Sequence, residues 1–150
     1  YEARLSDSMY KIIEYADSIE GRICFEQINR RYGDLYNSTA ETLRFIEKFK
    51  SARLFYNADT YHMITDEGDI ADAIRLSKDR MSLFHVSDMG RMLPDDRHFD
   101  FHAAAAALHS IGYDGWVTIE CRPIPNETEV AQKGMEYLKR VFCPAQFCLL

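Results

Sequence analysis

The segment MSLFHVSDMGRMLPDDRHFDFHAAAAALHSIGYDGWVTIE, residues 81–120, decides the fold class. It opens with an apolar β-type run at residues 81–84, continues through an alanine-rich helical stretch at 101–111, and closes with a second apolar run at 116–119. Gly112 ends the helical stretch. One helix between two strands favours parallel pairing through a right-handed crossover, because an antiparallel hairpin needs only a short turn. The segment therefore predicts a βαβ unit.

The same alternation continues toward the N-terminus, where β-type runs lie at residues 23–25 and 54–58. Helical spacing or helix caps predict further helices at 9–19, from a cap at Ser38 or Thr39, at 69–76 and at 129–142. The residues that end the four runs are 33, 26 and 35 positions apart, each step being close to one βα unit of roughly 30 residues. We therefore predict an α/β fold with four parallel strands and no second domain.

Composition narrows the function classes. The 150 residues suffice for about one domain. A net charge of -6 without a dense basic cluster argues against nucleic acid or an anionic membrane as partner. No apolar run reaches the roughly 20 residues of a membrane span, and the start YEARLSDSMY lacks a signal-peptide layout. The four cysteines have no CxxC spacing, which favours free thiols. We expect a cytoplasmic protein that binds a small molecule or a cation.

Each β-type run ends at a residue that can bind a metal: Glu26, Asp59, His85 and Glu120. Period-2 alternation places these four side chains on one face of the sheet, and the ends of parallel strands meet at one rim. A single acidic residue at a strand end is usually a cap or a solvated charge, but four of four favour a shared site. Three carboxylates and one imidazole suit octahedral Mn²⁺, Mg²⁺ or Co²⁺, and Zn²⁺ also fits.

Five stretches carry a resemblance to a known family: ICFEQINR (23–30), NADTYHM (57–63), FHVSDMGR (84–91), HFDF (98–101) and IGYDGWVTIE (111–120). Together and in this order they resemble the xylose isomerase-like sugar isomerases and epimerases. The tagatose/psicose 3-epimerases and hydroxypyruvate isomerases are the nearest relatives by pattern. The resemblance implies a TIM (β/α)8 barrel, of which this chain would supply strands five to eight, the C-terminal half. On this basis residues 1–150 form one partial barrel domain, with a leading loop at 1–8, barrel units at 9–142 and a tail at 143–150.

The resemblance also implies residue roles. Glu26, Asp59, His85 and Glu120 match the four ligands of a divalent metal, in first place Mn²⁺. His62 and Arg91 match residues that contact substrate oxygens. Glu26 and Glu120 match the residues that move the substrate's proton from opposite sides.

Elementary chemistry agrees with these roles. Removing a proton next to a carbonyl builds negative charge on oxygen, and a divalent cation stabilises the resulting enediolate. One carboxylate can act as the base, and a second carboxylate can return the proton on the other face. We therefore expect a metal-dependent isomerase or epimerase that acts on a ketose or a hydroxy-keto acid.

Three places depart from the epimerase pattern. Residues 94–97, Pro-Asp-Asp-Arg, replace a glycine-rich turn, Tyr32 stands where some epimerases have a carboxylate, and Gly90 stands where an asparagine is common. The remaining histidines are not expected to be ligands: His98, His102 and His109.

Length leaves alternatives open, because a complete barrel needs roughly 250 residues. The chain is either a piece of a longer protein, which we favour, or a half-barrel that forms a homo-oligomer or pairs with a missing N-terminal half. An abasic-site endonuclease of the same superfamily is a second function class, although it would favour extra metal ligands and a basic surface. A non-catalytic half-barrel that acts as a binding module is the third.

Overall fold

A four-stranded parallel sheet forms the centre of the computed structural model, which describes residues 1–143. The strands lie in sequence order, β1-β2-β3-β4. Their bounds are β1 (Ile23–Glu26), β2 (Leu54–Asp59), β3 (Met81–Val86) and β4 (Trp116–Ile119). All three neighbouring pairs are parallel, which confirms the predicted α/β fold class with four crossover-linked strands. The sheet does not close into a barrel, because β1 and β4 each pair with one neighbour only.

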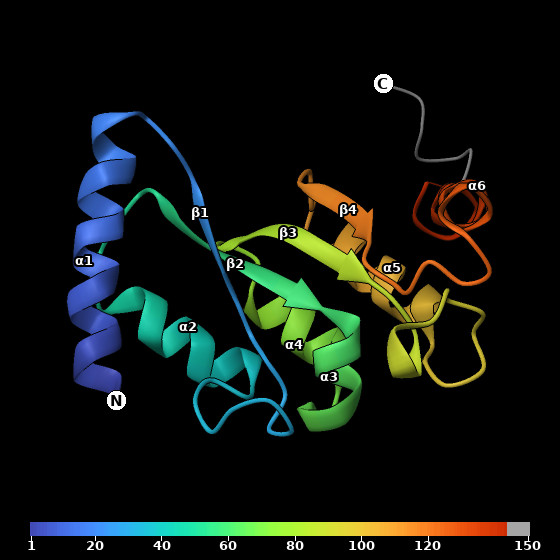
Figure 1. The fold of residues 1–150 in the computed structure, drawn as a ribbon, viewed down its shortest axis with the longest axis horizontal. Coiled ribbons are helices and arrows are strands. Elements are labelled where there is room, and N and C mark those ends of the chain that lie inside the picture. Colours follow the sequence, from blue (N-terminus) through green and yellow to red (C-terminus); the bar gives the residue numbers. More distant parts are fainter. Residues whose placement is uncertain (144–150) are drawn as a thin grey trace.

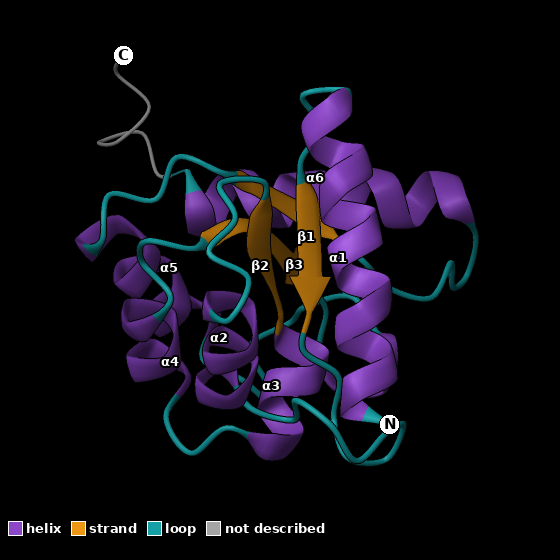
Figure 2. Ribbon diagram, turned by 90° about the vertical axis from the view of Figure 1, so that its left-hand side faces the viewer, coloured by secondary structure: helices purple, strands orange, loops and turns teal. Residues whose placement is uncertain are grey.

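Helices line one side and the two ends of the sheet (Figures 1 and 2). Their bounds are α1 (Glu2–Ser18), α2 (Thr39–Glu47), α3 (Thr60–Asp66), α4 (Ile70–Leu76), α5 (Phe101–Ser110) and α6 (Glu127–Phe142). In Figure 1, α1 lies beside β1 at one end of the molecule and α6 lies beyond β4 at the other. Helices α2, α4, α5 and α6 pack against one another in a row. Within the described residues, no helix is both long enough and apolar enough to cross a membrane.

The hydrophobic core lies between the sheet and this row of helices. Phe84 of β3 is fully buried, and its ring centroid lies 6.1 Å from that of Phe142 in α6. Phe45 of α2 and Phe101 of α5 are also buried, with at most 1% of their surface exposed. The predicted alternation is therefore present in β3, because Phe84 points into the core while its neighbour His85 points to the other face. Burial of one face fixes the register of the sheet and hence the place of its polar residues.

Most element boundaries agree with the sequence prediction, two features differ, and one open alternative is decided. The expected loop at 1–8 is wrong, because α1 begins at Glu2 and Met9 is already one of its buried residues. The cap of α2 is Ser38 rather than Thr39, and its side chain forms a reciprocal capping box with Glu41. Helix α3 was not predicted. Of the predicted tail at 143–150, residues 144–150 lie outside the described part of the chain.

Candidate metal centre

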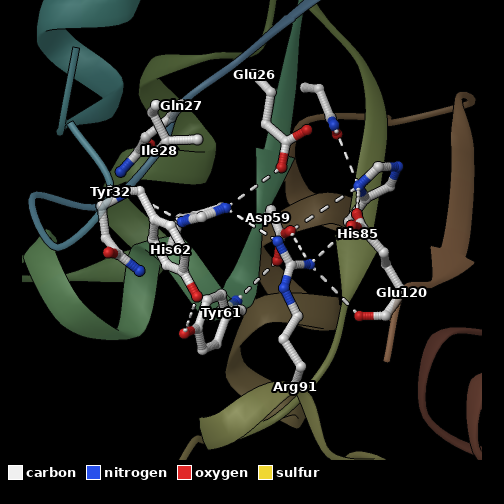
Figure 3. A network of polar contacts seen from close by, with 12 residues as sticks. Glu26, Gln27, Ile28, Tyr32, Asp59, Tyr61, His62, His85, Arg91 and Glu120 are labelled. Atoms are coloured by element: carbon white, nitrogen blue, oxygen red, sulfur yellow. Dashed lines mark hydrogen bonds and ion pairs between the residues drawn. The ribbon is translucent and has the colours of Figure 1, made fainter. Parts of the chain in front are cut away.

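Four side chains meet at the carboxyl ends of the strands. Glu26 ends β1, Asp59 ends β2, His85 lies in β3, and Glu120 follows β4 directly. Each offers one nitrogen or oxygen atom, and these atoms all lie within 4.8 Å of one another. Figure 3 shows Glu26 and Glu120 approaching Asp59 from different sides. The structure thus brings the four predicted residues together, and their role as metal ligands remains a prediction.

Asp59 is fully buried, and its two carboxylate oxygens have different partners. Its Oδ1 accepts a hydrogen bond of 2.9 Å from the backbone N–H of Tyr61, which caps the first turn of α3. Its Oδ2 points into the centre and lies 3.9 Å from Nδ1 of His85. The imidazole of His85 also contacts Glu120, and the side-chain amide nitrogen of Asn57 lies 3.2 Å from its Nδ1. The start of a helix therefore orients the carboxylate of Asp59, whose other oxygen lies in the centre.

His62 lies one turn into α3 and is almost fully buried. The backbone N–H of Asn29 donates a hydrogen bond of 2.9 Å to its Nδ1. Burial lowers the pKa of His62, which favours the neutral ring. A neutral imidazole that accepts at Nδ1 carries its proton on Nε2. That N–H lies 3.6 Å from Oε1 of Glu26, at the edge of the centre, where it can donate to a ligand.

Arg91 inserts its guanidinium between the carboxylates. Its Nη1 lies 2.6 Å from Oδ2 of Asp59 and 3.0 Å from Oε1 of Glu120. Its Nη2 lies 3.0 Å from Nε2 of His62, but both nitrogens are N–H donors in the tautomer described above, so this approach is not a hydrogen bond. Its Cζ lies 4.6 Å from the ring centroid of Tyr61. Figure 3 shows these contacts as one network. Without a metal, Arg91 offsets part of the negative charge of the central carboxylates.

The carboxylates of the centre destabilise one another. Burial raises the pKa of Glu26, and the negative charges of Asp59 and Glu120 raise it further, to about 8, against the opposing effect of Arg91. A divalent cation among these groups would remove that repulsion, because an opposite charge favours the ionised form. Three carboxylates and one imidazole are also a suitable donor set for such a cation. The residues therefore fit a divalent metal.

A profile of the xylose isomerase-like TIM barrel family matches residues 1–141. The chain belongs to this family. Family membership agrees with the resemblance on which the residue roles were predicted. It also explains the layout of the sheet, since TIM barrels build their sites at the carboxyl ends of parallel strands.

Two curated relatives illustrate what this chain is similar to. The chain is 28% identical over 118 residues to a D-psicose 3-epimerase from Agrobacterium fabrum, covering 79% of this chain and 41% of that protein. It is 31% identical over 111 residues to an L-ribulose 3-epimerase from Mesorhizobium japonicum, covering 74% of this chain and 37% of that protein. The chain thus spans about two fifths of the length of these relatives.

A solved structure of the same fold extends the comparison. The chain superposes on a crystal structure of D-psicose 3-epimerase determined in the presence of D-fructose, with a TM-score of 0.87 and 22% identity. The match covers 95% of this chain and 57% of that chain. The four strands and their helices therefore correspond to part of a TIM barrel. Their assignment to strands five to eight, the C-terminal half, remains a prediction.

Two departures from the epimerase pattern have a clear structural setting. Gly90 has a φ of +74°, in the left-handed region that glycine and asparagine adopt most readily, so the exchange of asparagine for glycine keeps the backbone. Arg91 follows with a φ of +61°, and its guanidinium lies in the centre. Tyr32 places its hydroxyl 3.1 Å from that of Tyr61, beside His62, so an aromatic pair stands where some epimerases have a charge.

Sequence reasoning missed two contributors to the site, Tyr61 and Asn29. Tyr61 supports the guanidinium of Arg91 through its ring, and the backbone of Asn29 sets the tautomer of His62. A recognisable signal existed for Tyr61, because it lies between the predicted residues Asp59 and His62 in one helical turn. No sequence signal existed for the contribution of Asn29, because any residue except proline carries a backbone N–H.

Proposed function

We propose that this chain supplies the divalent-metal centre of a sugar epimerase or isomerase that acts on a ketose or a hydroxy-keto acid. The observation that supports this most is the convergence of four metal-ligating side chains from the ends of four successive strands. The similarity to psicose and ribulose 3-epimerases supports the same reaction class. Since the chain spans about two fifths of those relatives, the activity belongs to the intact protein.

In this proposal Glu26, Asp59, His85 and Glu120 hold one cation, in first place Mn²⁺, and Mg²⁺, Co²⁺ or Zn²⁺ suit the same donors. When bound, such a cation polarises the substrate carbonyl and stabilises the negative charge that develops on its oxygen. The net charge of -6 favours a cation over an anionic polymer as the partner of this rim.

The chain's own residues would carry out the proton transfers. Glu26 and Glu120 come from the two outer strands of the sheet and approach the centre from different sides (Figure 3). One carboxylate can remove a proton from one face of the substrate, and the other can return it to the opposite face, which inverts the carbon. His62 offers an N–H and Arg91 a guanidinium fork to the substrate's oxygens. The substrate would pass through an enediolate.

The rest of the intact protein would cover the open edges of the sheet. Unpaired strand edges invite association, so we place an N-terminal half-barrel, or a second copy of the chain, against β1 and β4. The compartment that we propose is the cytoplasm. The thiols of Cys24 and Cys121 form no disulfide, as a reducing compartment requires.

The experiment that tests this function uses the intact protein and a panel of ketoses in D₂O with Mn²⁺. We expect deuterium to enter the carbon next to the carbonyl, and we expect a chelator to stop it. An abasic-site endonuclease would instead nick abasic duplex DNA and exchange no sugar proton. Nicking without exchange, or metal binding without either reaction, would contradict the proposal.

The raised pKa of Glu26 predicts a pH-dependent metal affinity. At neutral pH this carboxyl of the metal-free chain is largely protonated, because its pKa is about 8. Metal binding must therefore release a proton, and the affinity should rise up to about tenfold per pH unit between about pH 6 and pH 8, then level off. Calorimetry in buffers of different ionisation enthalpy measures both quantities. A metal affinity that does not change with pH in the wild type, or the same pH dependence in Glu26→Gln, would contradict the role of Glu26.

The raised pKa of Glu26 also makes the stability of the metal-free chain depend on pH. The folded-state pKa of Glu26 lies above its ordinary value of 4.5. The stabilising effect of the protonated form is therefore complete below about pH 4.5 and is lost as the pH rises toward about 8. Added metal should abolish this loss, because it stabilises the ionised form.

Arg91→Gln should separate substrate binding from metal binding. The guanidinium competes with a cation for oxygens of Asp59 and Glu120. Its removal should tighten metal binding by roughly 10- to 100-fold, since charge-assisted hydrogen bonds contribute about 1.5–3 kcal/mol. The KM for the sugar should rise at the same time, because the guanidinium that would contact the sugar's oxygens is lost. Metal titration and steady-state kinetics measure the two effects, and weaker metal binding in this variant would contradict the competition.

A further inference from the structure

A second group of metal-ligating side chains lies in the loop that follows β3. Asp88, Asp95 and His98 each offer one atom, and these atoms all lie within 4.8 Å of one another. None of the three residues belongs to the centre formed by the strand ends. His98 was not predicted as a ligand, because it lies next to the helical segment that forms α5.

Asp88 is the buried member of the group, with 2% of its surface exposed. Its Oδ1 accepts a hydrogen bond of 2.6 Å from the backbone N–H of Met89 and lies 3.4 Å from Nδ1 of His98. Its Oδ2 is also buried and has no hydrogen-bond partner in the described part of the chain. The hydrogen bond that caps the turn at Met89 explains the position of Oδ1. It does not explain why Oδ2 is buried. A buried carboxylate oxygen without a donor is costly, so it calls for a partner.

Asp95 brings a second carboxylate into the group, with its donor atom within 4.8 Å of those of Asp88 and His98. Two adjacent carboxylates repel each other unless they share a proton or a cation. The guanidinium of Arg97 donates a hydrogen bond of 2.5 Å from its Nε to Oδ2 of Asp95. The Arg97 side chain is 77% exposed, and an exposed ion pair of this kind is readily exchanged. Asp95 is therefore available to a cation.

Contacts with residues outside the cluster hold the loop in place. The hydroxyl of Tyr137 in α6 donates a hydrogen bond to Asp96, which lies between the two exposed members of the group. The ring of Phe99, directly after His98, packs edge-on against the buried ring of Phe101 at a centroid distance of 4.6 Å. The three donor groups are thus positioned by contacts that do not involve a ligand, as a preformed site requires.

We propose that Asp88, Asp95 and His98 bind a second divalent cation, independent of the centre at the strand ends. Two carboxylates and one imidazole supply hard oxygen and borderline nitrogen donors, and water would fill the remaining positions. Zn²⁺, Co²⁺ and Mn²⁺ accept such a mixed set, whereas Ca²⁺ requires six to eight oxygen ligands. The unpartnered oxygen of Asp88 would then face the cation.

The test uses the tag-free 150-residue chain, calorimetric titration with Co²⁺, and metal analysis of the loaded protein. The variant His85→Ala disables the strand-end centre, and we expect it to keep one bound equivalent. Adding His98→Ala or Asp95→Asn to that variant should remove the remaining equivalent. The matched control is His102→Ala, an exposed histidine on α5 that lies outside the group, and it should leave binding unchanged. Circular dichroism establishes that each variant is folded.

The outcomes separate this proposal from the function proposed above. If His85→Ala binds no Co²⁺, or if the retained equivalent survives both His98→Ala and Asp95→Asn, the second site does not exist. If the wild type binds one equivalent that depends on His98 and not on His85, the second site stands and the strand-end centre fails. Paramagnetic broadening of the His98 ring signals by Co²⁺ in His85→Ala gives an independent readout.

Discussion

Glu120→Gln is expected to reduce the rate of solvent deuterium exchange into a ketose by about 10³-fold or more in the intact protein with saturating Mn²⁺. A positioned acid or base contributes about 10²–10⁴-fold to a proton transfer, and this variant also removes a charge from the metal centre. The carboxylate of Glu120 reaches Arg91 and His85 from the end of β4, so its loss leaves one face of the site without a proton carrier. Mass spectrometry of the recovered sugar measures the exchange.

The matched control is Glu129→Gln, which makes the same chemical change at an exposed glutamate of α6 paired with Lys133. It should retain wild-type exchange. A Glu120→Gln protein that binds Mn²⁺ and still exchanges at the wild-type rate would remove Glu120 from the mechanism. If the Glu120→Gln protein loses both Mn²⁺ binding and exchange, the result would assign Glu120 to metal binding alone.

Phe84→Ala is expected to lower the free energy of unfolding of this chain by about 3–5 kcal/mol, the usual range for a phenylalanine deleted from a core. Phe84 is fully buried in the third strand and contacts the closing helix through Phe142. The cavity would form directly beneath His85, on the opposite face of the same strand. Urea unfolding followed by circular dichroism measures the change.

Tyr15→Ala provides the control for the core substitution, because that tyrosine on α1 is 66% exposed. It should change the unfolding free energy by no more than about 0.5 kcal/mol, as surface substitutions usually do. Equal effects of the two substitutions would show that β3 does not form the core of the folded chain. A loss confined to Phe84→Ala would support the packing described here.

The sequence was sufficient to predict the strand ends for a simple physical reason. Parallel strands joined by helices align their carboxyl ends, and a period of two residues places the last side chain of each strand on a defined face. The register pairs Asp59 with His85 across β2 and β3, which brings the predicted residues side by side. Convergence of the centre therefore follows from the topology and does not depend on loop conformations.

Loop geometry could not be predicted in this way. Helix α3 has only seven residues, too few for a periodic signal, and it forms where Asp59 caps its first turn. The position of the Arg91 guanidinium depends on two successive left-handed residues, Gly90 and Arg91. The burial of Asp88 depends on how the loop after β3 folds back. None of these tertiary features leaves a regular pattern in the sequence.

The most direct test of the metal centre is anomalous diffraction from crystals of the protein loaded with Mn²⁺. We expect one strong peak at the strand ends, with ligand atoms of Glu26, Asp59, His85 and Glu120 at roughly 2.0–2.3 Å. The guanidinium of Arg91 should then have left Asp59. No peak at this position, or a peak that fewer than three of these four side chains contact, would contradict the proposed metal centre.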